Sequence, residues 1–395
     1  MKLNNIPFVP ADILLPKNGF EKWACVACDQ FTSEPEYWDG AERFVGGAPS
    51  ALRCILPEVW LGDDNSGRIA AINSEMKKYL ADGVFAEYPD SMVYVERTLP
   101  DGSVRRGIVG AVDLEEYDFA PDSKSAVRAT EATVLSRIPP RVAIRKDAPI
   151  ELTHIMLLAD DPQKTIVEQF DPEADGLQKL YDFDLMQGGG HIKGWLLDGE
   201  NAKRVTDALL SLARKLPDGG ILIAVGDGNH SLATAKECYR ADPSAYSRYA
   251  LAELVNIHDP ALVFEPIYRV VFGCDPAELI KKAGAELAPG KNDIKWYSSK
   301  SEGRLSTEGL PADTLQRVID GYVAGTPGAY CDYVHGKESA IALGKEKNAV
   351  AFLFDGMDKS ELFPYVTERG ALPRKTFSMG EARSKRYYVE ARRIK

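Results

Sequence analysis

One stretch near the middle of the chain combines a strand-forming run, two glycines and the start of a helix. The run Ile221–Val225 is short, apolar and rich in β-branched residues, which is typical of a buried strand. Gly226 and Gly228 interrupt it, and Leu232–Arg240 continues at once with the composition of a helix. Where a strand turns sharply into a helix, backbone N–H groups and the positive end of the helix dipole meet. The sequence therefore predicts an anion site here, and phosphate is the usual occupant of such a site.

The same turn carries side chains that can perform chemistry. Asp227 supplies a carboxylate and His230 supplies an imidazole within a few residues of it. Glycine permits positive φ angles and a close approach of the backbone to a ligand. We expect the bound cofactor to contact Gly226, Gly228, Asn229 and Ser231. The spacing is one glycine short of the dinucleotide fingerprint G-x-G-x-x-G, and no clear acidic residue follows at the distance which that motif requires.

Composition limits the partners of the chain. Its 395 residues are too many for one small core, so two or three domains or subdomains are expected. The net charge of −11 argues against nucleic acid and anionic membranes. Basic residues do gather at the C-terminus, where nine Lys or Arg follow from Arg369 onward. A solvated or internally paired tail is the expected reading, and a contact with phosphate or a partner is the alternative.

Location and redox state also follow from composition. No signal peptide and no run long enough for a membrane span are recognisable, so we expect a cytoplasmic protein. The six cysteines are scattered, which fits free thiols in a reducing compartment. Cys25 and Cys28 form a C-x-x-C motif, but two further Cys or His ligands do not follow nearby. Chance or local packing is the simplest reading of this pair, and a redox pair is the alternative.

The order of the expected elements indicates the fold class. Two strand-like runs, Met92–Thr98 and Arg106–Val112, flank the turn at Pro100–Gly102 and predict a β-hairpin. Hairpins mixed with helices favour an α+β fold with mixed sheets and several subdomains over a regular βαβ repeat. We expect an N-terminal subdomain with the hairpin over 1–150, a core with the Asp227 loop over 151–273, and a C-terminal α+β subdomain over 274–395.

Periodicity predicts further elements. Helices are expected at Ile69–Leu80, Gln163–Phe170, Asn201–Leu216 and Pro311–Val323. Strands are expected at Glu151–Leu158, Ala340–Leu343 and Ala349–Phe354.

A second group of polar residues lies outside the turn. Arg128 carries a fork of donors suited to phosphate or carboxylate, and Glu131 follows it closely. We take Glu131 as a catalytic candidate, and Arg128 and Asn256 as substrate-binding candidates. These residues belong to the same site only if the fold brings them close to the Asp227 loop. His154 falls in an expected strand and is predicted to be a core or edge residue.

Five blocks of the sequence are distinctive, namely Gly226–His230, Leu254–Ile257, Pro266–Arg269, Tyr333–Gly336 and Leu372–Ser378. Together they resemble a widespread bacterial and archaeal family known only as domain of unknown function 1015. With the Tyr94 hairpin and the Arg128–Glu131 block, the resemblance covers nearly the whole chain. It implies a common fold but supplies no function.

The central loop is similar to the D-G-H-H-R loop of the free-serine kinases, which share a fold with ParB partition proteins and sulfiredoxins. In that fold the strand, loop and helix bind nucleotide phosphates, and in the kinases the aspartate and histidine serve metal binding and phosphoryl transfer. Asp227, Gly228 and His230 match this loop. Asn229 replaces the first histidine and Ser231 replaces the arginine, which removes one phosphate contact.

The resemblance implies a nucleotide-dependent phosphotransferase, or a phosphohydrolase, that acts on a small hydroxyl metabolite such as free serine or phosphoserine. ATP or ADP is the implied cofactor, with Mg²⁺ held by Asp227. A nucleotide-binding regulatory protein without turnover is one alternative, and a thiol-redox protein that uses Cys25 and Cys28 is another. We expect the binding partner to be a small-molecule substrate and not a nucleic acid or a membrane. The sequence leaves open whether the chain forms a homo-oligomer.

Overall fold

The computed structural model describes Met1 and residues 3–395, and internal contacts divide the chain into two compact units. Unit 1 comprises residues 1–262, 366–370 and 380–395, and unit 2 comprises residues 263–365 and 371–379. Mixed sheets and α-helices confirm the expected α+β class. The sequence predicted domain boundaries at residues 150 and 273, whereas the two units first separate after Leu262, and the chain returns to unit 1 at residues 366–370 and 380–395. The expected subdomains within unit 1 stay a prediction. Among the described residues, no helix has both the length and the apolar character that crossing a membrane requires.

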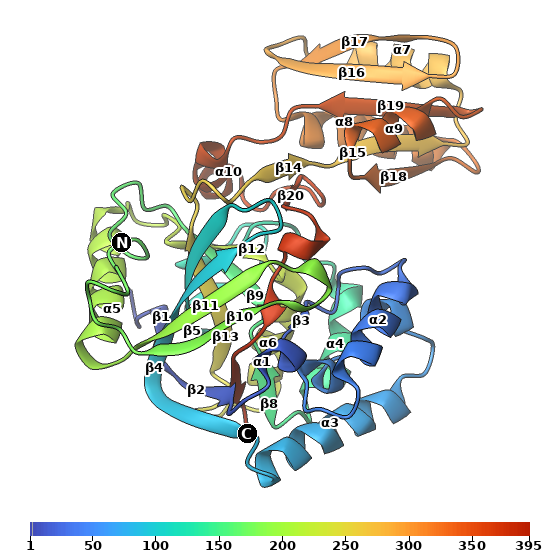
Figure 1. Cartoon of the computed structure of the whole chain (residues 1–395). Coiled ribbons are helices and arrows are strands. Elements are labelled where there is room, and N and C mark those ends of the chain that lie inside the picture. The colour runs from blue at the N-terminus through green and yellow to red at the C-terminus, as the bar shows by residue number, and fades with distance from the viewer. Residues whose placement is uncertain (2) are drawn as a thin grey trace. The chain divides into compact units, whose positions relative to one another are not determined.

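The main sheet of unit 1 has 13 strands and runs through both halves of the unit's sequence (Figure 1). Three strands attach beside its main path, namely β1 (Phe8–Val9), β10 (Lys179–Asp184) and β11 (His191–Leu197). The order along the main path is β6 (Tyr117–Asp118), β7 (Val127–Ala129), β12 (Ile223–Asp227), β9 (Ile155–Ala159), β13 (Tyr249–Asn256), β5 (Val104–Asp113), β4 (Phe85–Thr98), β2 (Ala11–Pro16), β22 (Ala391–Arg393) and β8 (Ile150–Leu152).

Strand directions around β12 are mixed. β12 pairs parallel with β7 and antiparallel with β9, and β9 pairs parallel with β13. The expected hairpin is confirmed as β4 and β5, which pair antiparallel with Glu96 opposite Arg106. A separate two-stranded sheet joins β3 (Cys25–Val26) to β21 (Tyr387–Tyr388), so the last residues of the chain pack against the first.

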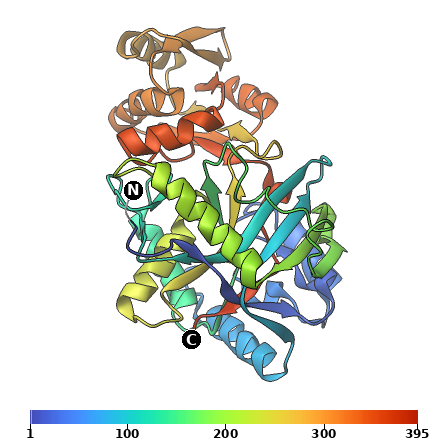
Figure 2. The ribbon, with the colours of Figure 1, turned by 90° about the vertical axis from the view of Figure 1, so that its left-hand side faces the viewer.

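Alternating side chains of the main sheet build a core on each of its faces. Val93 and Val95 belong to one core, and Met92 and Tyr94 belong to the other, as the two-residue period of a strand requires. The second core includes Val205, Leu209 and Ala213 of α5, which Figure 2 shows in light green lying across the strands. The α-helices of unit 1 are α1 (Phe20–Trp23), α2 (Pro35–Val45), α3 (Ser66–Ala81), α4 (Ile138–Arg145), α5 (Gly199–Lys215) and α6 (Asn229–Ala241).

Unit 2 is built on a five-stranded antiparallel sheet. Its order is β17 (Glu302–Thr307), β16 (Asn292–Ser298), β19 (Ala349–Phe354), β15 (Tyr268–Phe272) and β18 (Tyr330–Val334). Helices α7 (Pro276–Glu286) and α8 (Pro311–Gly325) share one core with Val350 and Phe352, while α9 (Lys337–Gly344) packs with Ala351 and Leu353 on the other face. A small sheet joins β14 (Phe264–Pro266) to β20 (Phe377–Met379), and α10 (Leu362–Arg369) spans the boundary between the units.

Two expected elements were wrong, and each has a local reason. The helix expected at Gln163–Phe170 does not form, because the Asp161 carboxylate accepts the N–H groups of Thr165 and Ile166 and holds a turn instead. The strand expected at Ala340–Leu343 is part of α9, whose buried residues Ala340 and Gly344 lie four positions apart on the same helical face. A short apolar run alone does not separate these two structures.

Candidate functional site at the Asp227 loop

The expected strand, turn and helix are present at the end of β12. The strand ends at Asp227, Gly228 is the N-cap residue, and α6 begins at Asn229. Gly228 has φ 83° and ψ 25°, the left-handed conformation that glycine adopts most readily. A Cβ atom here would lie 3.2 Å from His154 Cδ2 and 3.2 Å from the Cα atom of Ile155. Glycine therefore permits both the turn and the close approach of His154.

Both carboxylate oxygens of Asp227 are engaged by donors of the protein. Oδ1 accepts the N–H of Gly228 at 2.9 Å, and Oδ2 lies 3.1 Å from Nζ of Lys385. Burial alone would raise the pKa of Asp227, but the positive charges of Lys385 and His154 hold it below its ordinary value. The carboxylate side chain is 33% exposed, whereas that of Lys385 is 12% exposed. Asp227 is thus an anion at neutral pH with a nearly buried cation beside it.

His154 lies between β8 and β9 and faces the same turn. Its Nδ1 is 2.6 Å from the hydroxyl of Tyr388, and its Nε2 is 3.8 Å from Oδ2 of Asp29. Burial lowers the pKa of His154, but the neighbouring Asp29, Cys28 and Asp227 raise it to about 9. The imidazole is therefore positively charged at neutral pH. As expected from the sequence, both ring nitrogens of His154 have partners, but the residue lies in the break between β8 and β9 rather than inside a strand.

Hydrogen bonds join the start of α6 and the end of β12 to the segment that follows β7. The backbone N–H of Thr130 donates to Oδ1 of Asn229 at 3.2 Å, and the Thr130 hydroxyl donates to the Val225 carbonyl at 2.6 Å. The N–H of Val134 donates to Nε2 of His230 at 3.2 Å, so this ring nitrogen carries no proton. Glu131 follows Thr130 directly. The structure therefore brings the Glu131 segment to the Asp227 loop.

Arg128 and Asn256 point to other places. Arg128 donates to the carbonyls of Ser125, Gly219 and Gly220 at 2.6–2.8 Å, and Gly219 and Gly220 precede β12 whereas Asp227 ends it. The structure does not bring the Arg128 side chain to the loop.

Asn256 ends β13 and is paired in register with Ala159, while Asp227 is paired with Met156 at the other end of β9. Its amide donates to the Asp161 carbonyl at 2.8 Å and to the Glu168 carboxylate at 2.9 Å. Asn256 is buried there and is also apart from the loop.

Three side chains of this region were not identified from the sequence, Lys385 beside Asp227 and Asp29 and Tyr388 beside His154, and His154 was assigned no part in the site. Lys385 belongs to the C-terminal basic cluster, for which a phosphate contact was the alternative reading. That cluster was the one available signal. Nothing in the local sequence marked Asp29 or Tyr388.

Cys25 and Cys28 lie near Tyr388, and the surroundings of Cys25 are those of a buried core residue. Cys25 is 1% exposed, and burial raises the pKa of its thiol well above the ordinary value. A protonated, buried thiol is a poor nucleophile. The described residues contain no group of three or more His, Cys, Asp and Glu side chains arranged to hold a metal ion. The burial of Cys25 argues against a reactive thiol at that position.

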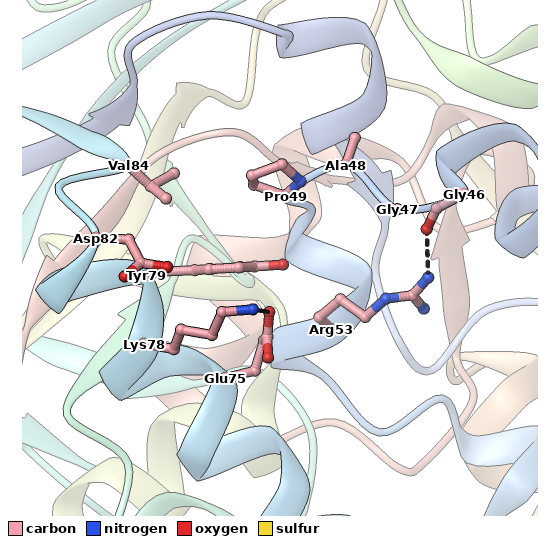
Figure 3. Close-up of a pocket in the computed structure, with 10 residues that line it drawn as sticks. All are labelled: Gly46, Gly47, Ala48, Pro49, Arg53, Glu75, Lys78, Tyr79, Asp82 and Val84. Carbon is pink, nitrogen blue, oxygen red and sulfur yellow. Dashed lines mark hydrogen bonds and ion pairs between the residues drawn. The ribbon is translucent and has the colours of Figure 1, made fainter.

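A separate pocket in unit 1 lies between the segment that follows α2 and the C-terminal part of α3 (Figure 3). Its volume is about 120 Å³, well below the roughly 300 Å³ at which ligand pockets usually begin. Both of its cationic side chains already have partners, since Arg53 donates to the Gly46 carbonyl at 3.0 Å and Lys78 lies 3.6 Å from Glu75. The pocket is lined by Gly46, Gly47, Ala48, Pro49, Arg53, Glu75, Lys78, Tyr79, Asp82 and Val84.

Comparisons with known proteins give a family and a group of distant structures. No curated protein matches the chain. A free serine kinase mutant in complex with AMP aligns with 11% identity and a TM-score of 0.41, over 71% of this chain and 90% of that one. SbnI from Staphylococcus aureus, with a C-terminal truncation, aligns with 10% identity and a TM-score of 0.36, over 72% of this chain and 81% of that one. A conserved hypothetical protein from Pyrococcus furiosus aligns with 11% identity and a TM-score of 0.35, over 71% and 90%.

We draw no activity from similarity at this level. A family model, by contrast, matches residues 9–364, which is most of the chain. Four of the five sequence blocks quoted above lie within this match, and Leu372–Ser378 lies beyond its end. The chain belongs to the family described as "Protein of unknown function (DUF1015)".

Proposed function

We propose that this protein is a nucleotide-dependent phosphotransferase that acts on a small hydroxyl metabolite, with free serine as the first substrate to test. One observation carries the proposal: a glycine-capped turn from β12 into α6 lies beside two positively charged side chains, Lys385 and His154. The first N–H groups of a helix point outward along its axis and favour an anion. Phosphate is the anion for which this combination is best suited.

The residues of the loop have distinct roles in this proposal. The backbone N–H groups at the start of α6 would hold a phosphate, with Asn229 and Ser231 as side-chain donors. His230 would donate to a phosphate oxygen from Nδ1, because Val134 already donates to Nε2. Asp227 would orient the attacking hydroxyl or hold the metal. Glu131 would contact the substrate, since its segment is fastened to the start of α6.

Mg²⁺ fits this site as a metal that arrives with the nucleotide. The described part of the chain offers no preformed cluster of ligands, and Asp227 is the carboxylate at the loop. Mg²⁺ is commonly held by one or two carboxylates together with substrate phosphates. Once bound, it would neutralise charge on the phosphates during transfer. Arg128 and Asn256 have no part in this proposal, because both lie away from Asp227.

A thermal-shift experiment tests the nucleotide site first. A ligand at about 100 times its Kd stabilises the folded state by about 2.7 kcal/mol, which raises the melting temperature measurably. We expect a shift with one of ATP, ADP, CTP or GTP in the presence of Mg²⁺, and a smaller shift in Asp227→Ala. Asp242→Ala is the matched control, because Asp242 is an exposed carboxylate at the far end of α6. Absence of any shift with all four nucleotides would refute the proposal.

Turnover then separates an enzyme from a binding protein. The assay incubates the protein with the stabilising nucleotide, Mg²⁺ and serine, or with phosphoserine for the reverse reaction, and detects the phosphorylated or free amino acid. Ser231 stands where the similar loop has an arginine, which favours binding without turnover as the second candidate. Nucleotide binding with no transfer to serine or other hydroxyl metabolites would support that regulatory role.

A further inference from the structure

The segment that carries Lys385 is held by arginines from the core of unit 1. Arg97 of β4 donates to the carbonyls of Arg383 and Lys385 at 3.0 and 3.4 Å. Arg105 of β5 donates to the carbonyl of Ser384 at 3.0 Å. Both guanidinium groups are buried. Three successive carbonyls of the C-terminal segment are therefore fixed by two buried cations.

The next residue sets the direction of the Lys385 side chain. Arg386 is buried, and its Nη1 lies 2.9 Å from Oε2 of Glu253 at the centre of the sheet. The backbone of Lys385 is extended, with φ −69° and ψ 171°. Consecutive side chains of an extended segment point to opposite sides. The inward anchor at Arg386 thus directs Lys385 outward, onto Asp227.

This arrangement creates a competition at Asp227. Because Gly228 and Lys385 engage the two carboxylate oxygens, a metal ion that binds Oδ2 competes with the positively charged ammonium group for that oxygen. The displaced ammonium stays beside the start of α6, since its backbone is fixed by Arg97 and Arg105. A phosphate held by α6 would offer it a new anionic partner of greater charge.

We propose that Lys385 is a phosphate-binding residue that exchanges partners, leaving Asp227 for the nucleotide phosphate as the metal–nucleotide complex binds. The proposal rests on the nucleotide site proposed above and adds a residue to it. In the ligand-free protein Lys385 neutralises Asp227 and keeps metal ions away. In the complex the metal takes Asp227, and Lys385 contacts the phosphate.

Lys385→Gln tests the exchange through two affinities that should change in opposite directions. ADP affinity, measured calorimetrically in the presence of Mg²⁺, should fall roughly tenfold or more because a charge-assisted contact is lost. Mn²⁺ affinity without nucleotide, measured by the electron-spin signal of the free ion, should rise, because the competitor for Asp227 is gone. Lys203→Gln on α5, with 62% of its side chain exposed, is the matched control and should change neither affinity.

A general loss of folding would lower both affinities and would overturn the proposal, as would an unchanged ADP affinity. The double variant Asp227→Asn/Lys385→Gln excludes a merely neutralising role for Lys385. If Lys385 only offsets the Asp227 charge, its removal should have no effect on ADP affinity in the Asp227→Asn background. If it binds phosphate, the roughly tenfold loss should persist there.

The outcomes for this inference and for the proposed function can be told apart. Opposite changes of the two affinities without any phosphoryl transfer would leave the exchange standing and reject the transferase. Phosphoryl transfer that persists in Lys385→Gln together with an unchanged ADP affinity would support the transferase and reject the exchange. Failure of the unmodified protein to bind ADP at all would overturn both.

Discussion

Substitution of Gly228 by alanine isolates the close approach between the loop and His154. An L-residue in the left-handed conformation costs roughly 1–2 kcal/mol. Gly19, the N-cap of α1, has nearly the same conformation, with φ 69° and ψ 35°, but no atom lies within 4 Å of a Cβ built on it. At Gly228 the new Cβ would also meet His154 and Ile155 at 3.2–3.3 Å. Crowding of this kind adds about 1–3 kcal/mol.

The assay is urea unfolding followed by tryptophan fluorescence, which reports mainly on unit 1. We expect Gly228→Ala to lose about 1–3 kcal/mol more unfolding free energy than Gly19→Ala. Nucleotide affinity should fall in Gly228→Ala alone, because the turn must shift to accept the methyl group. Equal destabilisation by the two substitutions would refute the reasoning from close approach. The reporters in unit 1 are Trp23, Trp38, Trp60 and Trp195.

Three further outcomes are expected. The pKa of His154 is raised to about 9 from its ordinary 6.5, so its stabilising effect is complete below pH 6.5 and is lost as the pH rises through 9. The unfolding free energy measured in urea should therefore fall with pH across this range, and His154→Gln should remove that dependence. Arg128→Ala should lower the unfolding free energy by about 2 kcal/mol through loss of its carbonyl contacts, while ADP affinity, measured calorimetrically, stays unchanged; a large fall in affinity would restore its role as a substrate ligand. Iodoacetamide should label Cys28 but not buried Cys25 in the folded protein, and peptide mapping that finds Cys25 labelled at the rate of the unfolded chain would contradict its burial.

Local patterns predicted the elements whose signal is contained in a single window. The helix at Asn201–Leu216 and the hairpin around Pro100–Gly102 agree with α5 and with β4 and β5. The Asp227 turn was also predictable, because a strand, two glycines and a helix follow one another there. The strand expected at Glu151–Leu158 is broken into β8 and β9, and the break is the place where His154 turns toward the loop.

The rest of the site could not be predicted, because it is assembled across long separations. Lys385 meets Asp227 from 158 positions away, and Tyr388 meets His154 from 234 positions away. Neither pair leaves a periodic trace in the sequence, and each depends on buried arginines that set the path of the C-terminal segment. The cluster of basic residues at the C-terminus indicated a role for Lys385, but it did not predict that Asp227 is its partner.

The insertion of unit 2 into the sequence of unit 1 has a consequence for the order of folding during synthesis. Strand β22, which lies between β2 and β8, is translated after most of unit 2 has been made. Domains fold as units while the chain emerges, so unit 2 can be complete while unit 1 still has β2 and β8 without their shared neighbour. A nascent chain arrested at residue 379 would contain the whole of unit 2 and Asp227, but not Lys385. If the proposed exchange holds, a chain arrested there would bind ADP more weakly than the finished protein, because Lys385 is added only with the final segment.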